Sequence, residues 1–93
     1  MGMKFNISYH EDVVKNDIPK LDNAVKQRVK KAIEEKLSQH PDVFGKPLRR
    51  SIKGYRKLRV GDYRVIFRIE KEKIRIFIIQ HRSSVYKNVD KRI

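Results

Sequence analysis

The sequence has 93 residues, and its 24 Lys and Arg against 11 Asp and Glu give a formal net charge of +13. This length suits a single domain over residues 1–93, and the lack of cysteine excludes disulfides and thiolate metal sites, which fits a reducing cytoplasm. We expect no membrane span and no secretory signal, and the strong positive charge favours a polyanionic partner, with nucleic acid before a membrane surface.

The N-terminal half predicts one strand and two helices. Apolar and polar residues alternate from Lys4 to Tyr9, which is typical of a strand with one buried face. A short helix follows, and Pro19 should end it because proline disrupts a helix interior. Asp22 is a typical N-cap for a second helix, which His40-Pro41 should end. The apolar stripe of that helix is Val25, Val29, Ala32, Ile33 and Leu37.

The C-terminal half predicts a loop, three strands and a tail helix. Glycine and proline favour a loop over Pro41–Gly54. The two turn residues Gly61-Asp62 between alternating runs indicate a β-hairpin. A short helix is expected from Ser83 onward. The three expected strands are Tyr55–Val60, Tyr63–Ile69 and Ile74–Gln80.

The element order β-α-α-β-β-β is typical of an α+β fold, here an antiparallel sheet with two helices packed on one face and a short C-terminal helix. Strand alternation sorts the side chains onto two faces. The helices should cover Leu58, Val60, Tyr63, Val65, Phe67, Ile74, Ile76 and Ile78. The opposite, open face should carry Lys57, Arg59, Arg64, Ile66, Arg68, Arg75, Phe77, Ile79 and His81.

The open face has the composition of a phosphodiester site. Arg82 emerges at its rim, and Tyr86 lies one helical turn further along. Arginine forks pair with phosphate oxygens, tyrosine stacks on unstacked bases, and histidine titrates near neutrality. Only Asp62 among the acids lies nearby, so we expect no carboxylate cluster for Mg²⁺. Metal-free cleavage of RNA through its own 2′-hydroxyl fits these groups.

The stretches KPLRR, GYRKLRVGDYRVIFRI and IIQHRSSVYK resemble the RelE/ParE superfamily of toxins from type II toxin–antitoxin systems. Within it they resemble the RelE branch, the ribosome-dependent mRNA interferases. The length and the element order match over essentially the whole chain, and GDYRVIF followed by HRSSVY is fairly specific to the superfamily. The resemblance implies a toxin that enters the ribosomal A site, cuts the mRNA there and is held inactive by a cognate antitoxin.

The resemblance also implies roles for individual residues. Arg64 and Arg82 correspond to catalytic cations, Tyr86 to a tyrosine that contacts the substrate, and Lys57 to a lysine of the active face, for which Arg56 is the alternative. His81 is a natural proton shuttle, although the resemblance leaves its role open. General attraction of RNA phosphates is expected from Arg49, Arg50, Lys53, Arg56 and Arg59.

Two other functions stay open on the same scaffold. One is a ParE-type inhibitor of DNA gyrase, and the other is a non-catalytic RNA-binding domain. The expected partners are a RelB-like antitoxin, acidic or amphipathic enough to complement the charge of +13, and a ribosome with mRNA in its A site. No cofactor, metal or membrane is expected.

Overall fold

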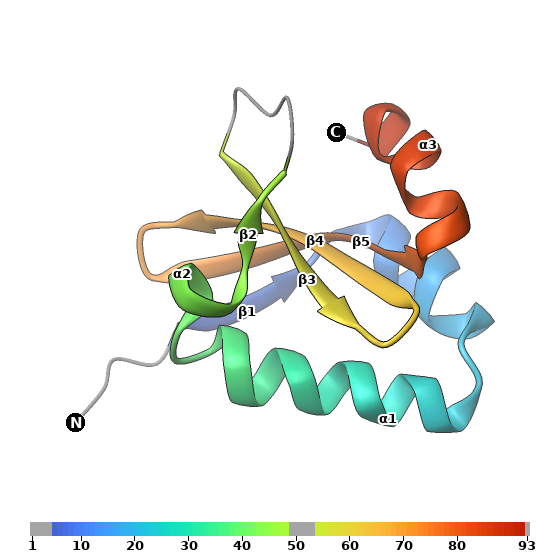
Figure 1. The fold of residues 1–93 in the computed structure, drawn as a ribbon, viewed down its shortest axis with the longest axis horizontal. Helices are drawn as coiled ribbons and strands as arrows, with labels where there is room; N and C mark the ends of the chain where they lie inside the picture. Colours follow the sequence, from blue (N-terminus) through green and yellow to red (C-terminus); the bar gives the residue numbers. More distant parts are fainter. Residues whose placement is uncertain (1–4, 49–53, 93) are drawn as a thin grey trace.

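The computed structural model describes residues 5–48 and 54–92, which form an α+β fold with two helical layers around one sheet (Figure 1). The first helical segment contains η1 (Val13–Asp17) and η2 (Ile18–Lys20), and the long helix α1 (Asn23–Ala32) continues directly into η3 (Ile33–Leu37). The other elements are β1 (Asn6–Tyr9), α2 (Pro41–Phe44), β2 (Lys46–Pro47), β3 (Tyr55–Val60), β4 (Tyr63–Glu70), β5 (Lys73–His81) and α3 (Arg82–Arg92).

Most of the predicted elements are confirmed. The carboxylate of Asp22 accepts a hydrogen bond from the backbone N–H of Val25 (2.9 Å) and so caps α1. The segment predicted as a loop differs, because Pro41 starts the short helix α2 and Lys46–Pro47 add a two-residue edge strand. Proline is favoured in the first turn of a helix, where its missing N–H costs nothing, and this explains how it both ends one helix and begins another.

The sheet is mixed rather than wholly antiparallel. Its strand order is β1-β5-β4-β3-β2, in which β1 pairs parallel to β5 and every other pair is antiparallel. The prediction of an antiparallel sheet was therefore wrong for β1. Alternation within a strand shows which face is buried and carries no information about the direction of its neighbour.

Helices cover both faces of the sheet. The α1 side holds the larger apolar cluster, where Val29, Ile33 and Leu37 pack on strand residues such as Val65 and Phe67. On the other face, Val85 and Val89 of α3 pack on a smaller cluster that comprises Tyr55, Ile66, Phe77 and Ile78. In Figure 1, α1 accordingly lies on one side of the sheet and α3 on the other. The face predicted to be open is thus partly covered by α3.

A β-bulge changes the faces in the second half of β5. Ile66 pairs with Ile78 and Phe67 pairs with Ile76, so Phe77 is an extra residue without a partner in β4. After the bulge the alternation is inverted, and Ile78 faces α3 whereas Ile79 faces α1. The predicted faces of Ile78, Ile79 and His81 were therefore wrong, while those of Leu58, Val65 and their neighbours in β3 and β4 are confirmed.

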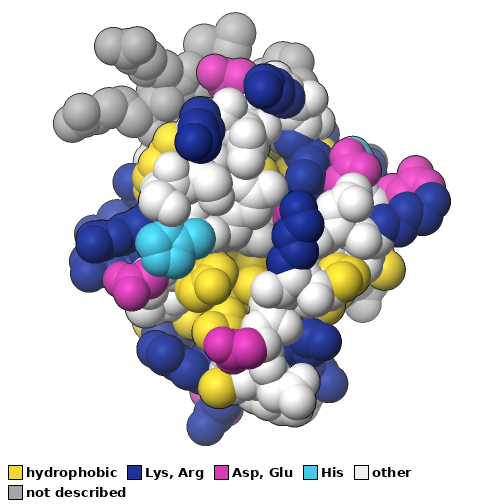
Figure 2. Space-filling view, turned by 90° about the vertical axis from the view of Figure 1, so that its right-hand side faces the viewer, with side chains coloured by type: hydrophobic (Ala, Val, Ile, Leu, Met, Phe, Trp, Pro, Cys, Tyr) yellow, Lys and Arg dark blue, Asp and Glu magenta, His cyan; other side chains and the backbone are white. Residues whose placement is uncertain are grey.

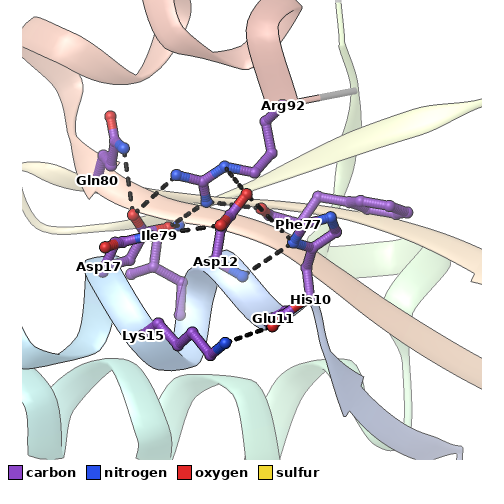
Figure 3. A network of polar contacts seen from close by, with 10 residues as sticks. His10, Glu11, Asp12, Lys15, Asp17, Phe77, Ile79, Gln80 and Arg92 are labelled. Carbon is purple, nitrogen blue, oxygen red and sulfur yellow. Dashed lines mark hydrogen bonds and ion pairs between the residues drawn. The ribbon is translucent and has the colours of Figure 1, made fainter.

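A buried ion pair completes the outer edge of β5. The strand β1 ends at Tyr9, opposite Ile76, and leaves the following backbone groups of β5 without a strand partner. Asp17 accepts from the N–H of Ile79 (2.9 Å), and Arg92 donates to the carbonyl of Phe77 (3.0 Å). Asp17 and Arg92 in turn pair with each other at 2.8 Å, with side chains only 2% and 12% exposed (Figure 3).

We predict that Asp17→Ala lowers the free energy of unfolding by about 3–5 kcal/mol, because it removes the nearer carboxylate from the buried Arg92 and the acceptor from the N–H of Ile79. Arg92 then keeps only the half-exposed Asp12, 3.5 Å from its Nε. Urea denaturation monitored by circular dichroism measures the loss. Lys91→Ala is the matched control, since Lys91 is an exposed neighbour of Arg92. A loss below about 1 kcal/mol for Asp17→Ala, the range of exposed pairs, would contradict the role given to this ion pair.

Candidate nucleic-acid interface

The hairpin of β3 and β4 places several cations on the α3 side of the sheet. Arg59 pairs with Arg64, and Lys57 pairs with Ile66, so all four side chains share one face. This confirms the predicted grouping of these cations. Regular alternation holds throughout both strands because the turn between them contains only Gly61 and Asp62, with Gly61 at φ +59°.

Arg64 and Arg82 converge on this turn. Nη1 of Arg64 donates to the carbonyls of Gly61 (3.0 Å) and Tyr63 (2.9 Å), while Nε and Nη2 of Arg64 have no partner among the described residues. The backbone N–H of Arg82 donates to the Asp62 carbonyl (2.8 Å), and its Nε lies 3.9 Å from the Asp62 carboxylate. The two arginines, 18 positions apart in the sequence, are therefore held at one end of one hairpin.

Tyr86 joins this group from α3. Nζ of Lys57 lies 5.5 Å from the centre of the Tyr86 ring, within the range of a cation–π contact, and the tyrosine is 43% exposed. An exposed aromatic ring beside cations is a suitable platform for an unstacked base. The structure thus brings together four of the predicted residues: Lys57, Arg64, Arg82 and Tyr86.

His81 lies on the opposite side of the sheet. It pairs with Tyr63, and the two rings meet edge to face with their centres 5.4 Å apart. Its Nδ1 accepts from the backbone N–H of Ser83 (3.1 Å), which places the proton of a neutral imidazole on Nε2. The expectation that His81 shares a face with Arg64 was therefore wrong, and the cause is the bulge at Phe77.

Gln80 occupies the position across from Arg64, and sequence reasoning missed it. Its amide N–H donates to Asp17 (3.2 Å), and its carbonyl oxygen accepts from Asn88 (2.8 Å). Gln80 therefore links the site to the buried ion pair and to α3. Sequence periodicity could not predict this position of Gln80, because it depends on the bulge at Phe77.

The remaining predicted cations fall into three groups. Arg56 is turned to the α1 side and donates to the carbonyl of Gly45 (2.7 Å), so it is not an alternative to Lys57 on the active face. Arg59 is exposed beside Arg64. Arg49, Arg50 and Lys53 lie outside the described residues.

Arg68 shares the face of Arg64 but is already paired. Its guanidinium group stacks against the rings of Tyr55 and Phe77, and Nε donates to Glu70 (2.8 Å). The hydrogen bond between the two side chains raises the pKa of Arg68 and lowers the pKa of Glu70. This pairing compensates the charge of Arg68 itself, whereas Arg64 keeps free donors at the hairpin end.

Two searches of the described residues gave no further kind of site. Across residues 5–48 and 54–92, no three His, Asp or Glu side chains gather closely enough to hold a metal ion. In the same ranges, no helix has the length and apolar character needed to cross a membrane.

The fold is that of a toxin from a toxin–antitoxin system. Residues 9–86 match the family described as the ParE toxin of the type II toxin–antitoxin system parDE. The chain belongs to this family, within the RelE/ParE superfamily of toxins.

Named relatives point to the RelE side of the superfamily. The chain is 40% identical to toxin RelG of Mycobacterium tuberculosis over 53 residues, which cover 55% of this chain and 61% of that toxin. It also resembles the solved toxin–antitoxin complex RelBE2 of M. tuberculosis, with a TM-score of 0.77, 29% identity, and coverage of 87% of this chain and 94% of that one.

Two more solved structures share the fold. The RelB–RelE antitoxin–toxin complex of Methanococcus jannaschii has a TM-score of 0.67 and 25% identity, with 84% of this chain and 93% of that chain covered. A mutant of E. coli toxin RelE in the free state has a TM-score of 0.65 and 24% identity, with 98% and 99% covered. These matches confirm the predicted α+β RelE-like fold.

We predict that Asp62→Asn strengthens binding of a single-stranded polyanion such as polyuridylate, because it frees the Arg82 guanidinium from the nearest carboxylate. Fluorescence anisotropy at fixed salt measures the affinity. Asp42→Asn in α2 makes the same charge change away from the hairpin and is the control. Equal affinity gains in both variants would mean that only net charge matters.

Proposed function

We propose that this toxin is a ribosome-dependent endoribonuclease that cleaves mRNA in the A site without a metal ion. The observation that carries the proposal is the convergence of Arg64 and Arg82 on the Gly61-Asp62 turn. Two guanidinium groups that contact the same turn suit the two non-bridging oxygens of one phosphodiester. The named RelE-type relatives support the same activity.

The proposed chemistry is a transesterification within the RNA. The 2′-hydroxyl oxygen forms a bond to phosphorus and loses its proton, while the bond from phosphorus to the 5′-oxygen breaks and that oxygen gains a proton. The products are a 2′,3′-cyclic phosphate and a 5′-hydroxyl, and no oxidant or co-reactant is needed. DNA lacks the 2′-hydroxyl and would not react.

The side chains contribute mainly by stabilising charge and fixing position. Arg64 and Arg82 stabilise the negative charge that develops on the phosphorane oxygens, and preorganised donors of this kind each contribute about 10²–10³ in rate. Lys57 adds a third positive charge on the same face. Tyr86, held by its contact with Lys57, stacks on a base and orients the substrate.

His81 is not placed to take the proton of a 2′-hydroxyl at the arginines. Its ring lies on the other side of the sheet from Arg64, and its Nδ1 is engaged by the N–H of Ser83. We therefore assign His81 to substrate binding rather than to proton transfer. On the cationic face itself, the titratable side chain beside Tyr86 is Lys57.

The proposed partners are the ribosome with its mRNA and a RelB-like antitoxin, and the proposed location is the cytoplasm. Two of the structural relatives are toxin–antitoxin complexes, which supports an antitoxin of this type. The formal charge of +13 favours an antitoxin with an acidic segment.

A second candidate function is inhibition of DNA gyrase. It is favoured by one observation, the match of residues 9–86 to the ParE toxin family. Supercoiling by purified gyrase in the presence of the toxin tests it directly. Inhibition of supercoiling together with intact mRNA on toxin-treated ribosomes would favour this alternative.

We predict that Arg64→Ala and Arg82→Ala each slow mRNA cleavage on programmed ribosomes by about 10²–10³-fold, because each removes a donor to the phosphorane. Primer extension on ribosomes with a defined A-site codon measures the rate. Lys30→Ala removes one charge from an exposed position of α1 and should cleave at the normal rate. Cleavage by the double variant at the normal rate would rule out the site.

We predict that affinity for single-stranded RNA falls with salt, with a slope of log K against log[salt] of about −3 if four cations contact phosphates. Arg59→Ala should make this slope shallower by about 0.7, because one phosphate contact is lost. Anisotropy titrations between about 50 and 300 mM KCl measure both slopes. A salt-independent affinity would contradict binding through the cationic face.

A further inference from the structure

A cavity with both apolar and polar lining lies beside the proposed site, at the end of the sheet where β4 begins and β5 ends. Its volume is about 320 Å³, near the lower end of the range for ligand sites. Leu21 and Ile79 supply apolar surface. The polar lining that matters here comes from Lys20, Tyr63, His81 and Asn88. Figure 2 shows this side of the molecule, with a hydrophobic patch below the centre, a His side chain beside it, and acidic and basic side chains around it.

Four polar side chains of this cavity retain free hydrogen-bonding capacity, whereas Asp17, Gln80 and Ser84, which also line it, are engaged within the protein. Nε2 of His81 is a donor in the neutral ring, because Nδ1 accepts from Ser83. The carbonyl oxygen of Asn88 is an acceptor, since only its N–H is used, in the bond to Gln80. The Tyr63 hydroxyl and the Lys20 ammonium likewise have no hydrogen-bond partner in the part of the chain that the structure describes.

We propose that this cavity binds one nucleobase of the RNA, adjacent to the linkage held by Arg64 and Arg82. The inference rests on the proposed RNA substrate and deepens it. The rings of Tyr63 and His81 meet edge to face, so a flat base can stack on the face of one ring beside the other. Fixed donors and acceptors on neutral side chains suit the hydrogen-bonding edge of a base, and Lys20 suits its phosphate.

The position of the cavity relative to the cations supports a shared ligand. Tyr63 and His81, which line the cavity, are paired across β4 and β5. Each of them immediately precedes one of the two arginines, Arg64 and Arg82. A phosphate at the arginines therefore lies one residue away from the mouth of the cavity. The RNA would turn around the end of the sheet, with its phosphate on one face and the base on the other.

The test is a titration of the full chain with each of the four ribonucleoside 5′-monophosphates. The NMR signals of the His81 ring and of the Asn88 side-chain amide report the binding. At least one nucleotide should saturate these signals, and ribose 5-phosphate, which lacks a base, should bind at least tenfold more weakly. His81→Ala and Asn88→Leu should each weaken that nucleotide at least tenfold. His40→Ala, at an exposed histidine that does not line the cavity, should bind it normally.

Three outcomes overturn the inference. Equal effects of ribose 5-phosphate would show a phosphate site only, and no response to any of the four nucleotides would show an unused cavity. Unchanged affinity in both His81→Ala and Asn88→Leu would place the base elsewhere. Binding is measured without ribosomes, so a chain that binds a nucleotide here but does not cleave mRNA would refute the proposed function and leave this site standing.

Discussion

The ion pair of Asp17 and Arg92 is the interaction on which the rest of the structure depends. It supplies an acceptor for the N–H of Ile79 and a donor for the carbonyl of Phe77. These two side chains therefore hydrogen-bond the part of β5 that β1, which ends at Tyr9, does not reach. Burial makes this arrangement demanding, since a carboxylate and a guanidinium group removed from water must satisfy each other. The same pair fastens the last turn of α3 to the sheet.

The position of Tyr86 follows from how α3 is held at its two ends. Its first residue, Arg82, donates its backbone N–H to Asp62 in the hairpin turn, and its last described residue, Arg92, is fixed by Asp17. Between these points Val85 and Val89 are buried against the sheet, which directs the exposed Tyr86 toward Lys57. Because only a narrow apolar surface of α3 packs on the sheet, the contacts at its two ends help to fix its orientation.

How far the sequence predicts the site depends on the regularity of each strand. Lys57 and Arg64 were placed correctly because β3 and β4 alternate without interruption. His81 was misplaced and Gln80 overlooked because a single extra residue, Phe77, inverts the second half of β5. Sequence periodicity does not indicate a bulge within an apolar run. It also did not predict that β1 runs parallel to β5 or that α3 covers part of the second face.

Composition also overstates how much positive charge faces a ligand. Arg92 pairs with Asp17, Arg68 with Glu70, and Arg56 with a backbone carbonyl, so three arginines serve the fold. What sets Arg64 apart from these three arginines is that it keeps free donors at the hairpin end. In a chain of charge +13, the proposed interface therefore consists of a small group of cations. Their placement depends on a two-residue turn at one end of the sheet and on a carboxylate buried at its edge.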